Sequence, residues 1–155
     1  QMRLVVVMSE VPAGTTTTLS TTGTLHFAIK SKAYSHAALT NQATPTTDWS
    51  TLAAFLGVKA GYGSIFMVGF NAAGDLKAVQ GSIEALDSGG AFINPPQFGG
   101  MPEDFCPFGY IVIKAGSTAD AVTGWVFGSS NMASVTGITY TFVDIVAMPP
   151  RPQIS

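Results

Sequence analysis

The side chains best suited to chemistry are two histidines, His26 and His36, and a single cysteine, Cys106. A zinc site needs roughly three or four converging His, Cys or carboxylate ligands, and these residues supply too few obvious ones. A Ser-His-Asp triad is defined by geometry and stays open at this stage, although no Gly-x-Ser-x-Gly motif is present. We interpret the histidines as surface or interface hydrogen-bonding residues. Cys106, between Phe105 and Pro107, is interpreted as a small buried hydrophobic residue.

Nine carboxylates are scattered along the chain, and Glu103-Asp104 is the only adjacent pair. Neighbouring side chains on a loop or strand diverge, so this pair is poorly placed to act as the two carboxylates of a glycosidase. We interpret it as part of a solvated turn or as a cap for a short helical turn. Asp87-Ser-Gly-Gly offers fewer ligands than a calcium loop requires, and no phosphate-binding glycine motif occurs. The sequence therefore predicts no enzyme, and no catalytic, metal-binding or cofactor-binding residue.

Aromatic residues leave a binding function open. Rings that lie exposed on a surface can stack on sugars, which gives a glycan-binding alternative. At strand spacing, however, such residues are more often core residues or anchors at the rim of a protein interface. The residues concerned are Trp49, Tyr62, Tyr110, Trp125 and Tyr140.

The chain is poor in charge. It has 155 residues, of which 46% are hydrophobic and only 10% charged, with a net charge of −2. Ordinary soluble domains carry about 25% charged residues. We therefore expect partner chains to cover much of the surface; the alternative is a monomer coated with uncharged Thr, Ser and Gly. No basic run exists, and no apolar run approaches the roughly 20 residues of a membrane span, so neither nucleic acid nor a membrane is an expected partner.

Short apolar runs punctuated by glycine and proline predict a chain made of strands. The clearest signal is a hairpin in which strands at residues 63–70 and 76–80 flank a loop at 71–75. The Thr-rich residues 15–24 predict an extended, exposed connection. Residues 48–57 fit a short helical turn or a loop that holds a hydrophobic plug. Further strands are expected at residues 3–8, 25–34, 108–114, 122–127 and 138–148.

These elements predict an all-β fold: a single-domain antiparallel β-sandwich, jelly-roll-like, or a small barrel, with long loops and extended termini. An extended N-terminal arm and Thr-rich segment is expected over residues 1–24, and the β-rich core domain over 25–148. A long loop rich in proline and glycine, residues 81–107, interrupts that domain. Residues 149–155 are expected to form an extended, Pro-rich tail.

The long loop combines a stiff backbone with apolar side chains, which favours an ordered docking loop over a disordered one. Proline lowers the entropy that a loop loses on binding. We expect three segments to contact other chains: residues 3–8, residues 92–105 of the loop, and residues 148–152. The predicted interface residues are Leu4, Val6, Phe92, Phe98, Met101, Phe105, Met148, Pro150 and Arg151.

Six stretches carry a resemblance to a known family: FAIKSKAY (27–34), TNQATPTTD (40–48), VGFNAAG (68–74), PEDFCPF (102–108), AGST (115–118) and GSSN (128–131). Together they resemble the capsid cement, or decoration, proteins of tailed bacteriophages over about residues 25–152, whereas the Thr-rich segment has no counterpart. The resemblance implies a β-rich homotrimer, made in the host cytoplasm, that sits on the capsid exterior of the virion. It also implies that the trimer clamps neighbouring subunits of the major capsid protein, and it brings no catalytic residues.

An alternative keeps the β-rich fold but changes the partner. A head-fibre or tail module would bind a receptor or glycan through an exposed aromatic platform, for which Trp125 is the residue to test. A cement protein instead gains from multivalency, because each weak contact with the shell raises the effective concentration for the next. Low charge, apolar loop residues and extended termini suit such bridging, so the cement hypothesis is preferred.

Overall fold

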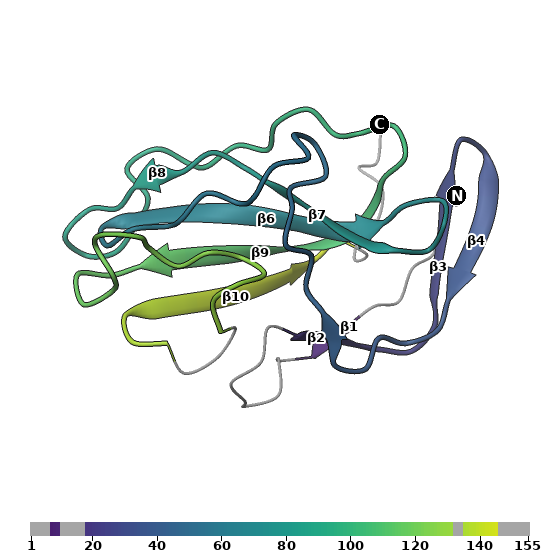
Figure 1. Cartoon of the computed structure of the whole chain (residues 1–155), viewed down its shortest axis with the longest axis horizontal. Coiled ribbons are helices and arrows are strands. Elements are labelled where there is room, and N and C mark those ends of the chain that lie inside the picture. The colour runs from purple at the N-terminus through teal and green to yellow at the C-terminus, as the bar shows by residue number, and fades with distance from the viewer. Residues whose placement is uncertain (1–6, 10–17, 132–134, 146–155) are drawn as a thin grey trace, which may run out of the picture.

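Two long antiparallel strands lie at the centre of the computed structural model (Figure 1): β6 (Tyr62–Phe70) and β9 (Cys106–Ala115). Next to β9 lies β10 (Ile138–Asp144), and next to β6 lies β7 (Leu76–Gln80). The short β8 (Glu84–Ala85) also pairs with β6. We call these five antiparallel strands the main sheet.

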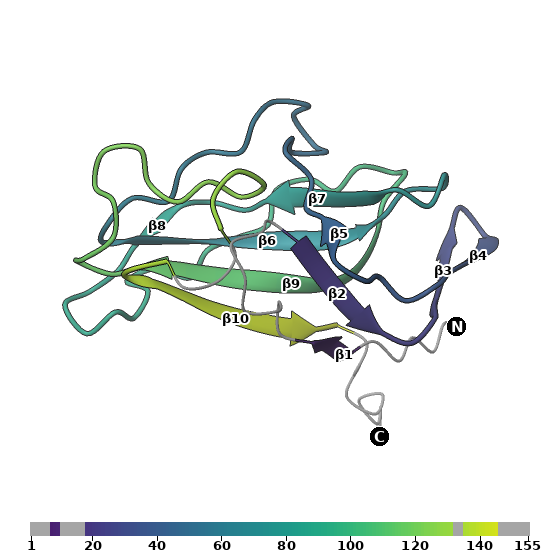
Figure 2. The same ribbon diagram turned by 60° about the horizontal axis from the view of Figure 1, so that its bottom comes forward.

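Two smaller sheets complete the fold. β1 (Val7–Ser9), β2 (Thr18–Thr22) and β5 (Gln42–Ala43) form a three-stranded sheet in the order β1-β2-β5. β3 (Leu25–Ile29) and β4 (Lys32–His36) form a hairpin at one end of the main sheet. Figure 2 shows β2 crossing the strands of the main sheet obliquely. The smaller sheets thus pack across the main sheet and complete a sandwich-like arrangement.

The prediction of an all-β, sandwich-like single domain is confirmed over the residues that the structure describes, which are 7–9, 18–131 and 135–145. These ranges contain no helix, and their sheets do not close into a barrel. It follows that they also hold no apolar helix of the length that crosses a membrane.

The β6–β7 and β3–β4 hairpins differ in how well the sequence predicts them. The loop between β6 and β7 matches the prediction, since the N–H of Asp75 donates to the Asn71 side chain over 2.8 Å and Gly74 has a φ of +84°. The turn between β3 and β4 was missed, and the expectation of one strand over 25–34 is wrong. Its central residues, Lys30 and Ser31, adopt φ values of 49° and 65° without any glycine. Positive φ at two successive turn residues is typical of a tight hairpin.

The Thr-rich segment is not simply an exposed connection. Thr18–Thr22 forms strand β2, in which Leu19 and Thr21 are buried. The Thr21 hydroxyl accepts a 2.9 Å hydrogen bond from the N–H of Leu39, which satisfies a polar group inside the protein. Threonine favours strands because it is β-branched, and here the packing against the core uses that preference.

Two further segments are loops, and the expected strand over residues 122–127 is wrong. For residues 48–57, the alternative of a loop that holds a hydrophobic plug is confirmed, with Phe55 as the buried plug. Residues 122–127 also form a loop, in which Trp125 pairs with Val58 through an isolated bridge with N···O distances of 2.8 and 2.9 Å. In both places the apolar spacing reflects single residues that reach the core from a loop.

Asp48 covers the outer edge of β7. The residue is only 6% exposed, and its carboxylate accepts hydrogen bonds from the N–H groups of Ser50 (2.7 Å) and Gln80 (3.0 Å). The N–H of Trp49 donates to the carbonyl of Ala78 over 2.8 Å. Backbone groups of β7 that would otherwise face outward are therefore satisfied by this loop.

An aromatic cluster fills the space between the layers. Phe66 stacks on Phe127 with ring centroids 4.9 Å apart, and it meets Phe55 and Trp125 edge to face, each at 5.8 Å. The buried apolar residues of β2, β3 and the loops pack against the same side of the main sheet, which we call the inner face. Phe66 is fully buried, so the cluster centres on one strand residue.

Replacing Phe66 by alanine is expected to lower the free energy of unfolding by about 3–5 kcal/mol, because the change removes buried apolar area and leaves a cavity. Urea unfolding followed by tryptophan fluorescence measures the difference. Val122→Ala is the control, since Val122 is 80% exposed and its truncation should change stability by less than about 0.5 kcal/mol. Equal stability of the Phe66 variant and the wild type would contradict the described core.

Candidate interaction surface

The two faces of the main sheet are covered to different extents. On β9, Ile111 and Ile113 point to the inner face and are buried, whereas the alternate residues Tyr110, Val112 and Lys114 are half-buried. On β10, Thr141 lies opposite Val112 and is exposed. The side of the sheet that carries Tyr110, Val112 and Thr141, which we call the outer face, is thus open over β9 and β10.

The first half of the long loop is fixed on the outer face by a close ring contact. The ring of Phe92 lies over Gly63, where an added Cβ would come within 2.6 Å of two ring carbons. The ammonium group of Lys114 lies 5.1 Å from the centroid of the same ring, within cation–π range. Phe92 also forms an isolated bridge with Leu86. Only glycine at position 63 leaves room for this arrangement.

The second half of the loop is held by both backbone and ring contacts. Gln97 and Ser82 exchange two hydrogen bonds, at 2.8 Å to the Gln97 carbonyl and 2.9 Å to the Ser82 hydroxyl. Phe98 packs edge to face on Tyr110, with centroids 5.6 Å apart. Phe105 is 8% exposed and joins a small cluster with Met67 and Val79 on the outer side of β6 and β7. The loop is therefore ordered and covers part of the outer face.

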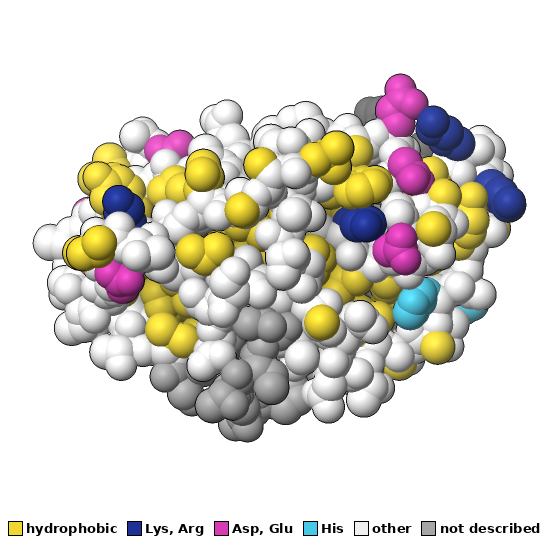
Figure 3. Space-filling view, in the orientation of Figure 1, with side chains coloured by type: hydrophobic (Ala, Val, Ile, Leu, Met, Phe, Trp, Pro, Cys, Tyr) yellow, Lys and Arg dark blue, Asp and Glu magenta, His cyan; other side chains and the backbone are white. Residues whose placement is uncertain are grey.

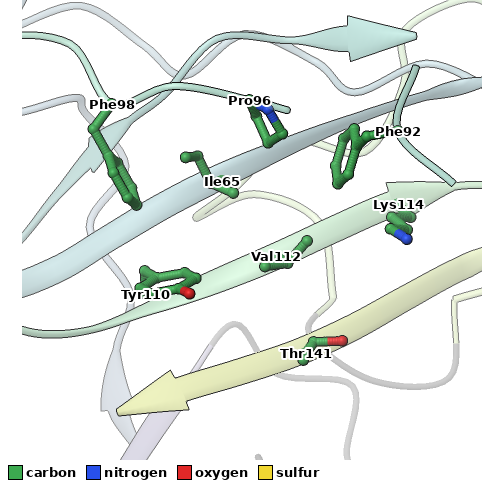
Figure 4. A pocket seen from close by; sticks show the side chains of 8 residues that line it. All are labelled: Ile65, Phe92, Pro96, Phe98, Tyr110, Val112, Lys114 and Thr141. Atoms are coloured by element: carbon green, nitrogen blue, oxygen red, sulfur yellow. The ribbon is translucent and has the colours of Figure 1, made fainter. Parts of the chain in front are cut away.

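A groove of about 430 Å³ lies between the loop and β10 (Figure 4). Phe92, Pro96 and Phe98 line its loop side, and Ile65 and Val112 lie between the loop and β10. The remaining lining residues are Tyr110, Lys114 and Thr141. Its lining is mainly apolar, with three aromatic rings, which is typical of surfaces that bind extended or apolar partners.

The structure separates the predicted interface residues into three groups. Phe92 and Phe98 line the groove, as a docking role requires. Met101 is 38% exposed but lies outside the groove lining, and Phe105 packs against its own sheet. The other predicted interface residues lie outside the described residues; they are Leu4, Val6, Met148, Pro150 and Arg151.

Sequence reasoning missed the part of the groove that the sheet contributes. Residues 108–114 form a nearly continuous apolar run, which hides which side chains face the core and which face outward. The signal that was available lies in the next strand, where Thr139 and Thr141 alternate with Tyr140 and Phe142. That alternation marks one polar and one apolar face, and the antiparallel register places Thr141 opposite Val112.

The residues suited to chemistry are spread over the fold. His26 is exposed on β3, while His36 stacks on Phe70 with centroids 4.5 Å apart and donates from Nδ1 to the Ala37 carbonyl over 2.7 Å. Cys106 is half-buried rather than fully buried, and this burial raises the pKa of its thiol. Over the described ranges, no group of three or more His, Cys, Asp or Glu side chains comes together.

The carboxylates singled out in the sequence have partners within the chain. Glu103 pairs with Lys30 over 3.0 Å at the surface, and Asp104 accepts a 2.7 Å hydrogen bond from the N–H of Ala72. The Asp87 carboxylate accepts bonds from the N–H groups of Gly89 and Ala91 in its own turn. The Glu103 and Asp104 contacts join the end of the long loop to the turns at Lys30 and Ala72, and Asp87 stabilises its own turn.

Trp125 does not form an exposed aromatic platform, so this part of the glycan-binding alternative is wrong. The side chain is 2% exposed and its indole N–H donates to the carbonyl of Asn131 over 2.9 Å. Trp49 is half-buried, with the ammonium group of Lys77 lying 4.4 Å from its ring centroid. Both tryptophans therefore serve packing inside this chain.

Replacing Gly63 by alanine is expected to displace Phe92 and lower the free energy of unfolding by about 1–3 kcal/mol, because the new methyl group occupies the position of the ring. Hydrogen exchange should show faster exchange at residues 86–93 than in the wild type. Gly99→Ala is the matched control, since no atom lies within 4 Å of its added Cβ. If both variants behave like the wild type, Phe92 does not rest on Gly63.

Comparison of the chain with protein-family models, with curated proteins and with solved structures finds no match in any of the three.

Proposed function

We propose that this protein is a non-enzymatic structural component of a virion that associates with copies of itself and binds the outer surface of a capsid. In this role it cements neighbouring subunits of the major capsid protein. The observation that carries the proposal is the open outer face of the main sheet, with its aromatic groove of about 430 Å³. An apolar surface of this kind is typical of protein–protein contacts.

The distribution of charge supports a partner-covered surface. On the face drawn in Figure 3, charged side chains stand singly or in small groups, with wide uncharged areas between them. Among the side chains that the structure describes there are two ion pairs, Lys30–Glu103 at 3.0 Å and Lys77–Asp75 at 3.9 Å. With so few charges, little electrostatic desolvation opposes the burial of this surface.

A ring of copies on a capsid would bind by multivalency. A trimer carries three copies of every surface and therefore offers the shell three equivalent contacts. The first contact with the shell raises the effective concentration for the others, and modest individual contacts then add up to stable retention. Such bridging resists the separation of neighbouring capsid subunits without any catalytic step.

Native mass spectrometry and sedimentation of the full chain should show a stable trimer at micromolar concentration. The trimer should be retained on purified capsid shells, and shells without it should disrupt at a lower temperature than decorated shells, because the bridges between subunits are missing. A chain that stays monomeric and shows no affinity for shells would count against the proposal.

Substituting Val112 by aspartate is expected to weaken self-association, and with it shell retention, by about tenfold or more, because association would bury an unpaired carboxylate in the groove. Cosedimentation with shells over a range of protein concentrations gives the apparent affinity. Val122→Asp makes the same chemical change at an 80% exposed site and should bind like the wild type. Equal loss in both variants would indicate a general effect of charge, and no loss in either would place the contact surface elsewhere.

A further inference from the structure

We propose that the groove on the outer face is the docking site for the Pro-rich segment Met148–Pro152 of a second copy of this chain. The inference builds on the proposed self-association and names the contact that produces it. The groove presents three aromatic rings and a proline from one side of the sheet: Phe92, Phe98, Tyr110 and Pro96. Grooves lined by aromatic rings are the surfaces that recognise polyproline II segments.

The dimensions of groove and segment agree. The groove follows β9 from Tyr110 to Lys114, which are four residues apart in a strand and therefore about 13 Å apart. Met148 to Pro152 also spans four steps, and in polyproline II geometry it covers about 12 Å. Three of its five residues are prolines, and Met148 is restricted to extended geometry because a proline follows it. A segment restricted in this way loses little entropy when it docks.

The path of the chain favours a neighbour's groove over the chain's own. The N–H of Ile145 donates to the carbonyl of Phe108 over 3.4 Å, so β10 points away from the groove where the described residues end. To enter its own groove it would have to reverse direction within Val146 and Ala147. Tight reversals favour Gly, Asn or Asp at these positions, and a β-branched valine disfavours positive φ.

Electrostatics set the direction of docking. Lys114 occupies the Phe92 end of the groove, and its positive charge repels Arg151. The other end offers the ring faces of Phe98 and Tyr110, on which a guanidinium group can stack. Arg151 is therefore placed at the Phe98–Tyr110 end, with Met148 toward Lys114.

A tail-to-groove contact is heterologous, because each copy gives its tail to one neighbour and receives a tail from another. Such a contact closes a ring when the rotation between copies allows it, and three copies make the smallest ring beyond a dimer. The arrangement predicts complementation: a copy with a damaged tail keeps a working groove, and a copy with a damaged groove keeps a working tail.

The test uses two full-length variants. Pro149→Ser with Pro150→Ser damages the tail, and Thr141→Arg damages the groove by adding bulk and a charge that repels Arg151 at an exposed site. Each variant alone should raise the dissociation constant of self-association by about tenfold or more in sedimentation velocity. Mixed in equal amounts, the two should form heterodimers and no larger species, since only one working tail and one working groove meet.

Thr136→Arg is the control, because Thr136 is exposed and lies outside the groove lining. Thr141→Trp, which fills the groove without adding charge, is a second groove variant should Thr141→Arg unfold. Oligomers that persist in both variants, or variants that fail to complement, would overturn tail exchange. If the wild type is then still oligomeric and retained on shells, the proposed function stands without it. A monomeric wild type that does not bind shells would overturn both.

Discussion

Antiparallel pairing between β6 and β9 sets the geometry of the whole molecule. Both strands are apolar on both faces: Phe66 lies opposite Ile111 on the inner face, and Ile65 lies opposite Val112 on the outer face. Both faces of such a sheet must be covered if its apolar side chains are to be shielded from water. The inner side is covered by rings and smaller sheets of the same chain, while the long loop covers the outer side over β6 and β7 but only part of β9. At the groove, the described residues leave apolar side chains of the outer face uncovered.

Much of the fold could be predicted because its signals are local. The alternation of Leu25, Phe27 and Ile29 and the Asn-to-Asp loop at 71–75 both depend on neighbouring residues alone. The turn at Lys30 and Ser31 could not be predicted, since neither lysine nor serine is a residue type that favours positive φ. For residues 48–57 the sequence could not decide between a helical turn and a plugged loop, because single loop residues can reach a core at any spacing that the loop path allows.

The candidate site was predicted only on its loop side. Phe92 and Phe98 stand out in the sequence because large apolar residues are unusual among so many glycines and prolines. Their partners in the sheet do not stand out, because an inward and an outward valine or isoleucine look alike in an apolar run. Gly63 shows the limit most clearly. Its role under the Phe92 ring joins residues far apart in sequence, and it appears only when the strands are set in register.

The coverage of β7 by Asp48 has a consequence for how copies of the chain can meet. A sheet with two free edges can grow in both directions, as fibrils do. Here one side is closed by a buried carboxylate and by the Trp49 backbone, so strand addition is blocked at β7. Because the protein carries few charges, electrostatic repulsion between copies does little to prevent open-ended association. The blocked edge therefore favours assemblies of finite size over open-ended polymers.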